Sequence, residues 1–194
     1  MNLANKLTMS RIMLVPFFIM LLEFHLFWTS VFALIIFIIA SVTDLIDGRI
    51  ARSRNSVTTL GIFLDPLADK LLISSAFICF AVIDYLYVPA WMVIAIIARE
   101  FIITGLRALA ASKNVIIPAD KSGKFKTTFQ VIAIIVILLI IVITEGLAKY
   151  HIQASQTMDS VFRATPFIAT FLVAFFTLYS GFKYIWKHKK LFNE

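Results

Sequence analysis

The chain has 194 residues, of which 61% are hydrophobic and 15% charged, and its formal net charge at pH 7 is +7. A membrane span needs roughly 20 apolar residues, and a mean hydropathy of +0.94 leaves room for several spans, which excludes an ordinary soluble domain. The single cysteine, Cys79, excludes an internal disulfide framework and a CxxC metal site, and we expect it to be a small core residue.

Apolar runs along the chain predict an all-α integral membrane protein with six transmembrane helices, forming one domain over residues 1–194. The predicted helices cover approximately residues 9–27, 29–53, 60–83, 88–112, 125–147 and 161–186. No small-residue cleavage site follows the first apolar segment, so we interpret it as a helix rather than a signal peptide. Pro89 is expected to open the fourth helix, where its missing N–H costs nothing.

The basic residues predict how these helices are oriented. With the N-terminus in the cytoplasm, all but two of the 18 Lys and Arg residues fall on the cytoplasmic side, and the other side keeps Lys149 and Arg163. This asymmetry is the positive-inside pattern, so we expect both termini in the cytoplasm. The same pattern favours anionic headgroups and substrates, rather than nucleic acid, as partners of the positive charge.

Four aspartates lie near the predicted cytoplasmic ends of the second and third helices, namely Asp44, Asp47, Asp65 and Asp69. Their spacings of three and four residues place each pair on one helix stripe, so two antiparallel helices can bring all four carboxylates together. Without a cation the gathered carboxylates would repel each other. Oxygen ligands with no His or Cys nearby suit a hard divalent cation such as Mg²⁺ or Mn²⁺.

The residues beside the aspartates indicate a phosphate-containing ligand. Gly48, Ala51 and Gly61 are small enough to let a ligand or a neighbouring helix approach the backbone closely. Arg52 adds a planar donor suited to phosphate. A metal cluster with such neighbours suggests phosphoryl or phosphatidyl transfer. In the alternative interpretation, the aspartates only pair with nearby basic residues.

These positions form the pattern D-x2-D-G-x2-A-R-x8-G-x3-D-x3-D between Asp44 and Asp69. The pattern resembles, without substitution, the signature of the CDP-alcohol phosphotransferase family. The N-terminal segment NKLTMSR resembles the N-x-L-T-x-x-R opening of such enzymes. The segment from Ala98 to Gln130, with its REF, GLR and GKFKTTFQ elements, resembles the bacterial phosphatidylglycerophosphate synthases of this family.

The resemblance implies a reaction and a role for each matched residue. The 1-hydroxyl of sn-glycerol-3-phosphate would attack the β-phosphorus of CDP-diacylglycerol, giving phosphatidylglycerophosphate and CMP. Asp44, Asp47 and Asp65 would bind one or two Mg²⁺ or Mn²⁺ ions, and Asp69 would bind metal and act as general base. Gly48, Ala51 and Arg52 would hold the nucleotide and its diphosphate, with Gly61 packing beside them. A homodimer in the bacterial inner membrane, with its active site facing the cytoplasm, is also implied.

The acceptor carries a phosphate dianion and therefore needs a second basic pocket. We expect Arg107 and Lys124, followed by Lys126, to bind this phosphate, and we expect Glu100 to form a structural ion pair. The alternatives are the same chemistry with another acceptor (inositol phosphate, serine or phosphatidylglycerol) or a divalent-cation transporter. A transporter would place its carboxylates near the bilayer midplane on broken helices, whereas these lie at helix ends beside arginines.

Overall fold

The computed structural model describes residues 3–54, 59–112 and 121–187, and it describes side chains at residues 8–43, 68, 70–111 and 126–187. Within these residues the chain forms helices only, which confirms the expected all-α class. The elements are α1 (Leu3–Glu23), α2 (Phe27–Arg54), α3 (Thr59–Val82), the short 3₁₀ helix η1 (Asp84–Leu86), α4 (Ala90–Ser112), α5 (Lys121–Lys149) and α6 (Gln156–Lys187).

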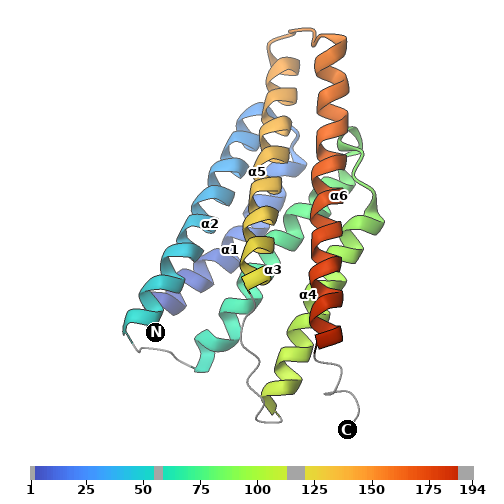
Figure 1. Ribbon diagram of the computed structural model, residues 1–194. Coiled ribbons are helices and arrows are strands. Elements are labelled where there is room, and N and C mark those ends of the chain that lie inside the picture. Colours follow the sequence, from blue (N-terminus) through green and yellow to red (C-terminus); the bar gives the residue numbers. More distant parts are fainter. Residues whose placement is uncertain (1–2, 55–58, 113–120, 188–194) are drawn as a thin grey trace.

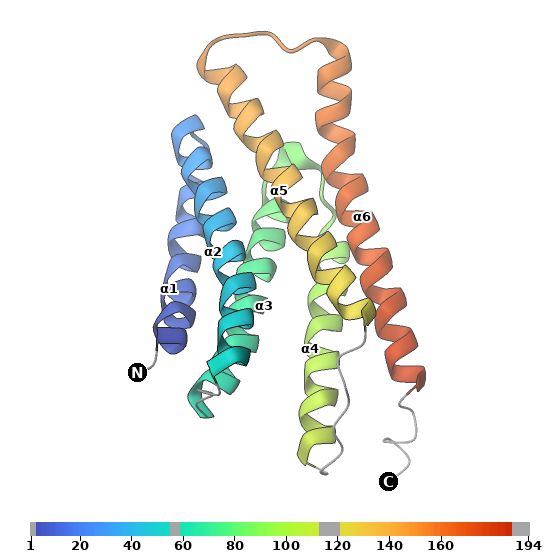
Figure 2. The same ribbon diagram turned by 60° about the vertical axis from the view of Figure 1, so that its left-hand side comes forward.

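The six long helices run alternately up and down one elongated bundle (Figures 1 and 2). Helix α1 packs against α2 and α3, α4 packs against α3 and α6, and α5 packs against α2 and α6. The last turns of α2, α4 and α6 and the first turns of α1, α3 and α5 all lie toward the lower end in Figure 1. The connections α1–α2, α3–α4 and α5–α6 lie toward the other end.

The first helix ends earlier than the sequence predicts, at Glu23 rather than near residue 27. His25 adopts a φ of 48°, in the left-handed region, and its N–H donates to the Leu22 carbonyl at 3.3 Å. This conformation closes the last turn of α1. Hydropathy does not locate this end because the apolar residues Phe24, Leu26 and Phe27 continue past the turn.

The last helix begins earlier than predicted, at Gln156 rather than at 161. The Ser155 hydroxyl accepts a hydrogen bond from the Met158 N–H at 3.3 Å, as an N-cap residue does. Asp159 follows in the first turn, where a negative charge complements the helix dipole. The prediction followed the apolar run and therefore missed the polar turn that precedes it.

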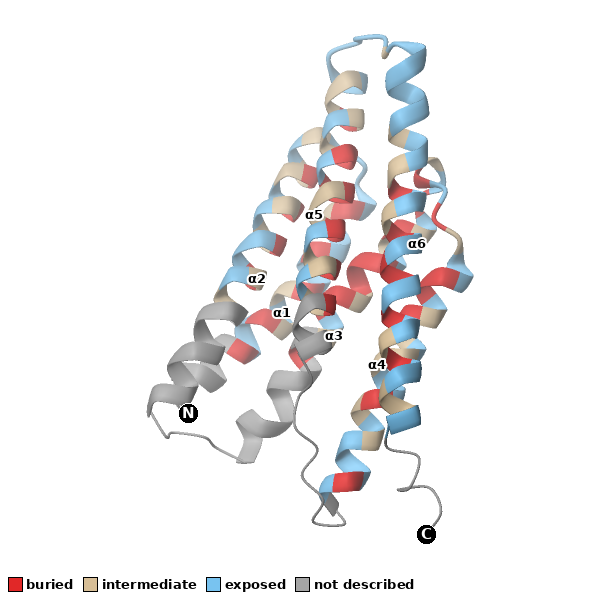
Figure 3. Cartoon of the chain, viewed as in Figure 1, coloured by how far each residue is buried: buried red, intermediate tan, exposed pale blue. Residues whose placement is uncertain are grey.

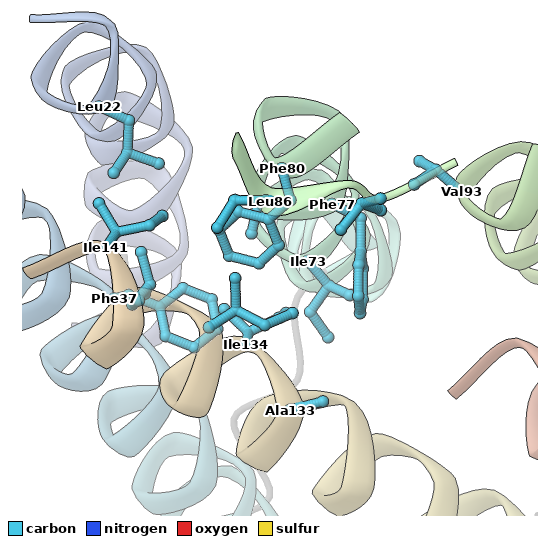
Figure 4. Packing of buried hydrophobic residues seen from close by; sticks show 14 of the residues in the cluster. Leu22, Phe37, Ile73, Phe77, Phe80, Leu86, Val93, Ala133, Ile134 and Ile141 are labelled. Carbon is cyan, nitrogen blue, oxygen red and sulfur yellow. The ribbon is translucent and has the colours of Figure 1, made fainter. Parts of the chain in front are cut away.

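The core consists of large apolar side chains contributed by all six long helices and by η1. Figure 4 shows Phe37 of α2, Ile134 and Ile141 of α5, and Phe77 and Phe80 of α3 packed together near Leu22 of α1 and Leu86 of η1. Between helices in a membrane, close packing of such side chains stabilises the bundle through van der Waals contacts. This core fixes the two ends of the bundle relative to each other, including the end that carries the aspartate motif.

The outward faces of the bundle are also apolar. Figure 3 shows buried residues along the helix–helix contacts and exposed residues on the outside. The exposed side chains include Met13, Ile94, Phe175, Phe182 and Trp186, each more than half exposed. Two helical stretches among the described residues, Lys126–Lys149 and Gln156–Lys187, are long and apolar enough to cross a membrane by length and composition. An apolar outer surface of this extent is typical of a protein in contact with lipid.

Lys149 and Arg163, the two basic residues expected on the far side, are both held against aromatic rings. The Lys149 ammonium lies 4.7 Å from the Trp28 ring centroid and 5.2 Å from that of Phe27. Arg163 Nη1 donates to the Tyr87 hydroxyl at 2.9 Å. Cation–ring contacts of this kind suit a headgroup boundary, where amphipathic rings gather.

Candidate active site

The fold brings the two halves of the aspartate motif to one end of the bundle. Asp44, Asp47, Gly48, Ala51 and Arg52 lie in the last turns of α2. Gly61, Asp65 and Asp69 lie in the first turns of α3, and both helix ends point to the lower end in Figures 1 and 2. The side chains of these eight residues lie outside those that the structure describes, so their mutual distances stay a prediction.

Helix α1 contacts both helices of the motif, and it contributes two buried polar side chains near its start. Thr8 and Arg11 are 3% and 4% exposed. Both belong to the N-terminal segment whose resemblance was noted from the sequence, although no role was predicted for either. A buried guanidinium requires compensating anions or acceptors, and α1 packs against the two helices that carry the aspartates.

The motif composition, rather than measured geometry, supports a metal site. Four carboxylates on two helix ends supply the hard oxygen ligands that a divalent cation prefers. Among the side chains that the structure describes, no group of three or more His, Cys, Asp or Glu residues could hold a metal ion. The four aspartates of the motif are not among those described side chains. Their carboxylate oxygens are the ligand type that a divalent cation prefers.

The residues expected to bind the acceptor are brought to the same half of the bundle by α4 and α5. Arg107 is exposed near the end of α4, and Lys124 lies in the first turn of α5, with its side chain outside the described set. Lys126 is buried, with 8% of its surface exposed. Its ammonium donates to Glu100 Oε1 on α4, so the expected ion pair of Glu100 is confirmed.

Glu100 is the centre of a polar cluster that links three helices. Its Oε1 also accepts from Gln130 Nε2 at 3.3 Å and lies 3.8 Å from Arg99 Nη1. Arg99 Nη2 in turn donates to Ser180 Oγ of α6 at 3.1 Å. The stem of Arg99 lies against Gly181, where an added Cβ would be 2.8 Å from Arg99 Cγ. Only a residue without a side chain leaves this space for Arg99.

A second buried carboxylate, Glu145, lies toward the opposite end of α5. Its Oε2 accepts a hydrogen bond from Ser30 of α2, and His25 Nδ1 is 3.9 Å from its Oε1. Burial, and then the nearby Glu145 charge, raise the pKa of Tyr85 in η1. The Ser30 hydrogen bond links α2 to α5. This cluster lies too far along the helix from the motif end to take part in the same site.

Comparison with known proteins gives a consistent result. The family model described as CDP-alcohol phosphatidyltransferase matches residues 1–154. The chain is similar to the CDP-diacylglycerol–glycerol-3-phosphate 3-phosphatidyltransferase of Bacillus subtilis, with 39% identity covering 96% of this chain and 95% of the relative. Proteins of the same name from Rickettsia felis and Escherichia coli K12 are 34% and 35% identical, covering 98% and 82% of this chain and 97% and 91% of the relatives.

Proposed function

Because the chain belongs to the CDP-alcohol phosphatidyltransferase family, we propose that it transfers the phosphatidyl group of CDP-diacylglycerol to sn-glycerol-3-phosphate. The products are phosphatidylglycerophosphate and CMP, and the reaction belongs to phospholipid biosynthesis. The acceptor assignment is supported by relatives that carry this activity in their names and match over nearly their whole length.

One observation carries the proposal. The complete eight-position motif is divided between the end of α2 and the start of α3, and the bundle directs these two helix ends to one side. Arg107 of α4 and Lys124 of α5 lie on helix ends directed to that same side. A donor site and an acceptor site can therefore share one end of the bundle, as transfer between two substrates requires.

The carboxylates divide the work at the donor site. Asp44, Asp47 and Asp65 hold one or two divalent cations, Mg²⁺ or Mn²⁺, through oxygen ligands. When bound, the metal neutralises charge that develops on the phosphoryl oxygens. Asp69 completes the ligand set and accepts the proton of the attacking acceptor hydroxyl as general base, which requires it to lie within hydrogen-bond reach of that hydroxyl.

The remaining motif residues bind the nucleotide end of the donor. Arg52 donates to the diphosphate, since its planar guanidinium matches phosphate oxygens. Gly48 and Ala51 leave space for the cytidine diphosphate beside the backbone of α2, and Gly61 leaves the same space on α3. By the resemblance to the family, the acyl chains lie among the helices.

The acceptor phosphate binds to the basic residues that α4 and α5 bring to the motif end. Arg107, which is exposed, and Lys124 are the proposed phosphate ligands. Lys126, predicted from the sequence as the third phosphate ligand, lies near the start of α5 and is ion-paired with Glu100. Lys126 is buried, whereas Arg107 is exposed.

The membrane orientation follows from the same charges. We infer six membrane spans with both termini in the cytoplasm of a bacterial cell, in its inner membrane, and an active site facing the cytoplasm. The clustering of basic residues toward the motif end supports this orientation, as do the aromatic contacts of Lys149 and Arg163. We also infer a homodimer, on the resemblance to the family.

The test is an acceptor panel with purified protein in detergent. CDP-diacylglycerol and Mg²⁺ or Mn²⁺ are supplied with sn-glycerol-3-phosphate, inositol phosphate, serine or phosphatidylglycerol, and CMP release is measured. The proposal expects release that requires sn-glycerol-3-phosphate and stops when EDTA removes the metal. Release with another acceptor would keep the metal chemistry and overturn the acceptor assignment. Folded protein that releases no CMP with any acceptor would overturn the function.

A further inference from the structure

Glu100 is a largely buried carboxylate to which the transfer reaction gives no role. Its side chain is 15% exposed and that of Lys126 is 7% exposed, so the ion pair between α4 and α5 is screened from water. Gln130, which is 2% exposed, donates to the same oxygen. Two donors from α5 therefore converge on one carboxylate oxygen of α4. This arrangement links the two helices through their side chains.

The pair changes what Lys126 can do for the acceptor. A buried ammonium that already donates to a carboxylate must give up that partner before it can meet a phosphate. Breaking a buried pair is unfavourable because it leaves an uncompensated charge behind. Lys126 is thus better suited to hold α5 in place than to act as a free phosphate ligand.

The ion pair lies on the same two helices as the two proposed phosphate ligands. Arg107 follows Glu100 by seven residues, so both lie on one face of α4, about two helical turns apart. Lys124 precedes Lys126 by two residues at the start of α5. Any shift of α5 relative to α4 would change the distance between Arg107 and Lys124.

Helix α6 supports Glu100 from the other side. Arg99, next to Glu100 in the chain, donates to Ser180 and lies along Gly181. Its Nη1 also faces Glu100 Oε1. Glu100 Oε1 therefore faces basic side chains from its own helix and from α5.

We propose that Glu100 is a positioning residue of the acceptor site, which holds Lys126 so that Arg107 and Lys124 are correctly spaced for the acceptor phosphate. This inference rests on the proposed function. It assigns Lys126 to the support of the pocket rather than to direct contact with the phosphate. It also predicts that the charge pair, rather than either charge alone, determines the KM for the acceptor.

The test compares Glu100→Gln, Lys126→Gln and the double variant Glu100→Gln/Lys126→Gln. KM and kcat are measured for sn-glycerol-3-phosphate at saturating CDP-diacylglycerol. Each single variant should raise the acceptor KM about tenfold or more, with a smaller effect on kcat, because it removes one partner of the buried ion pair between α4 and α5. The double variant should recover most of the loss, since two glutamines can hydrogen-bond across the same gap without a charge.

Glu145→Gln is the matched control. It neutralises another buried carboxylate of α5, which accepts a hydrogen bond from Ser30 of α2 and lies toward the opposite end of the bundle. It should leave the acceptor KM unchanged. If Lys126 instead binds the phosphate directly, Glu100→Gln will leave KM unchanged or lower it, and the double variant will be as impaired as Lys126→Gln. Either of these results would overturn the proposal while leaving the function intact, whereas inactive wild-type protein would point to the function itself.

A milder variant keeps the test decisive if Glu100→Gln does not fold, as judged by gel filtration in detergent. Gln130→Met removes the second donor to Glu100 without leaving a charge unpaired. The proposal expects a rise of a few-fold in the acceptor KM and no change in the KM for CDP-diacylglycerol. An unchanged acceptor KM in folded Gln130→Met protein would contradict it.

Discussion

Substituting Gly181 by alanine tests the packing that supports the polar cluster. An added Cβ would lie 2.8 Å from Arg99 Cγ and 3.1 Å from Arg99 Nε, so the arginine stem must move and its hydrogen bond to Ser180 is put at risk. Gly105 of α4 provides the control, because an added Cβ there meets nothing within 4 Å. The two substitutions make the same chemical change in two different surroundings.

The expected magnitudes have opposite signs. Replacing glycine by alanine within a helix gains about 1 kcal/mol. At Gly181 this gain is outweighed by overpacking, typically about 1–3 kcal/mol, and by loss of a charged hydrogen bond, about 1.5–3 kcal/mol. We expect a net loss of about 2 kcal/mol, which lowers Tm by about 4–8 °C for a chain of this size. Gly105→Ala should raise Tm by about 2–4 °C.

The assay is thermal unfolding of both variants and the wild type in one detergent, followed by circular dichroism. Opposite shifts of Tm would support the close packing of Arg99 against Gly181. Two equal increases would refute the reasoning, because they would mean that the space beside Gly181 accepts a methyl group. In that case Arg99 would not be held in the position from which it faces Glu100.

Two further predictions concern the two ends of the bundle. Arg107→Met should raise the KM for sn-glycerol-3-phosphate about tenfold or more while Lys149→Met does not, since only Arg107 lies at the proposed acceptor site; equal effects in steady-state CMP release would contradict this. Ser30→Ala should lower stability by about 1.5–3 kcal/mol, because it removes the donor to buried Glu145. Ser75→Ala is the control, because among the contacts described the Ser75 hydroxyl donates only to the Leu72 carbonyl of its own helix. This control should change Tm much less. Similar losses of Tm in the two variants would contradict the role of Ser30.

Hydropathy predicted the number and order of the long helices within the described residues, because an apolar run of helical length has few other ways to satisfy its backbone. Helix ends were predicted less well. The end of α1 depends on the left-handed conformation of His25, and the start of α6 depends on the cap at Ser155. Both are local backbone features that the apolar pattern does not record.

In the candidate site too, some features could be predicted from the sequence and others could not. The aspartate motif could be recognised because its whole pattern is confined to the short stretch from Asp44 to Asp69. The partner of Glu100 could not be identified, since Lys126 lies 26 residues away on another helix and the two side chains meet only in the folded bundle. The sequence predicted Lys126 as a phosphate ligand from its charge alone, and that role stays a prediction.

The most direct test of the central claim is the activity of Asp69→Asn. We expect CMP release with sn-glycerol-3-phosphate and Mg²⁺ or Mn²⁺ to fall by about 10²–10⁴-fold, because the general base and a metal ligand are lost together. The variant should elute from gel filtration like the wild type, and Asp84→Asn, in the exposed η1 turn, should keep full activity. Wild-type activity in folded Asp69→Asn protein would contradict the proposed chemistry of the motif.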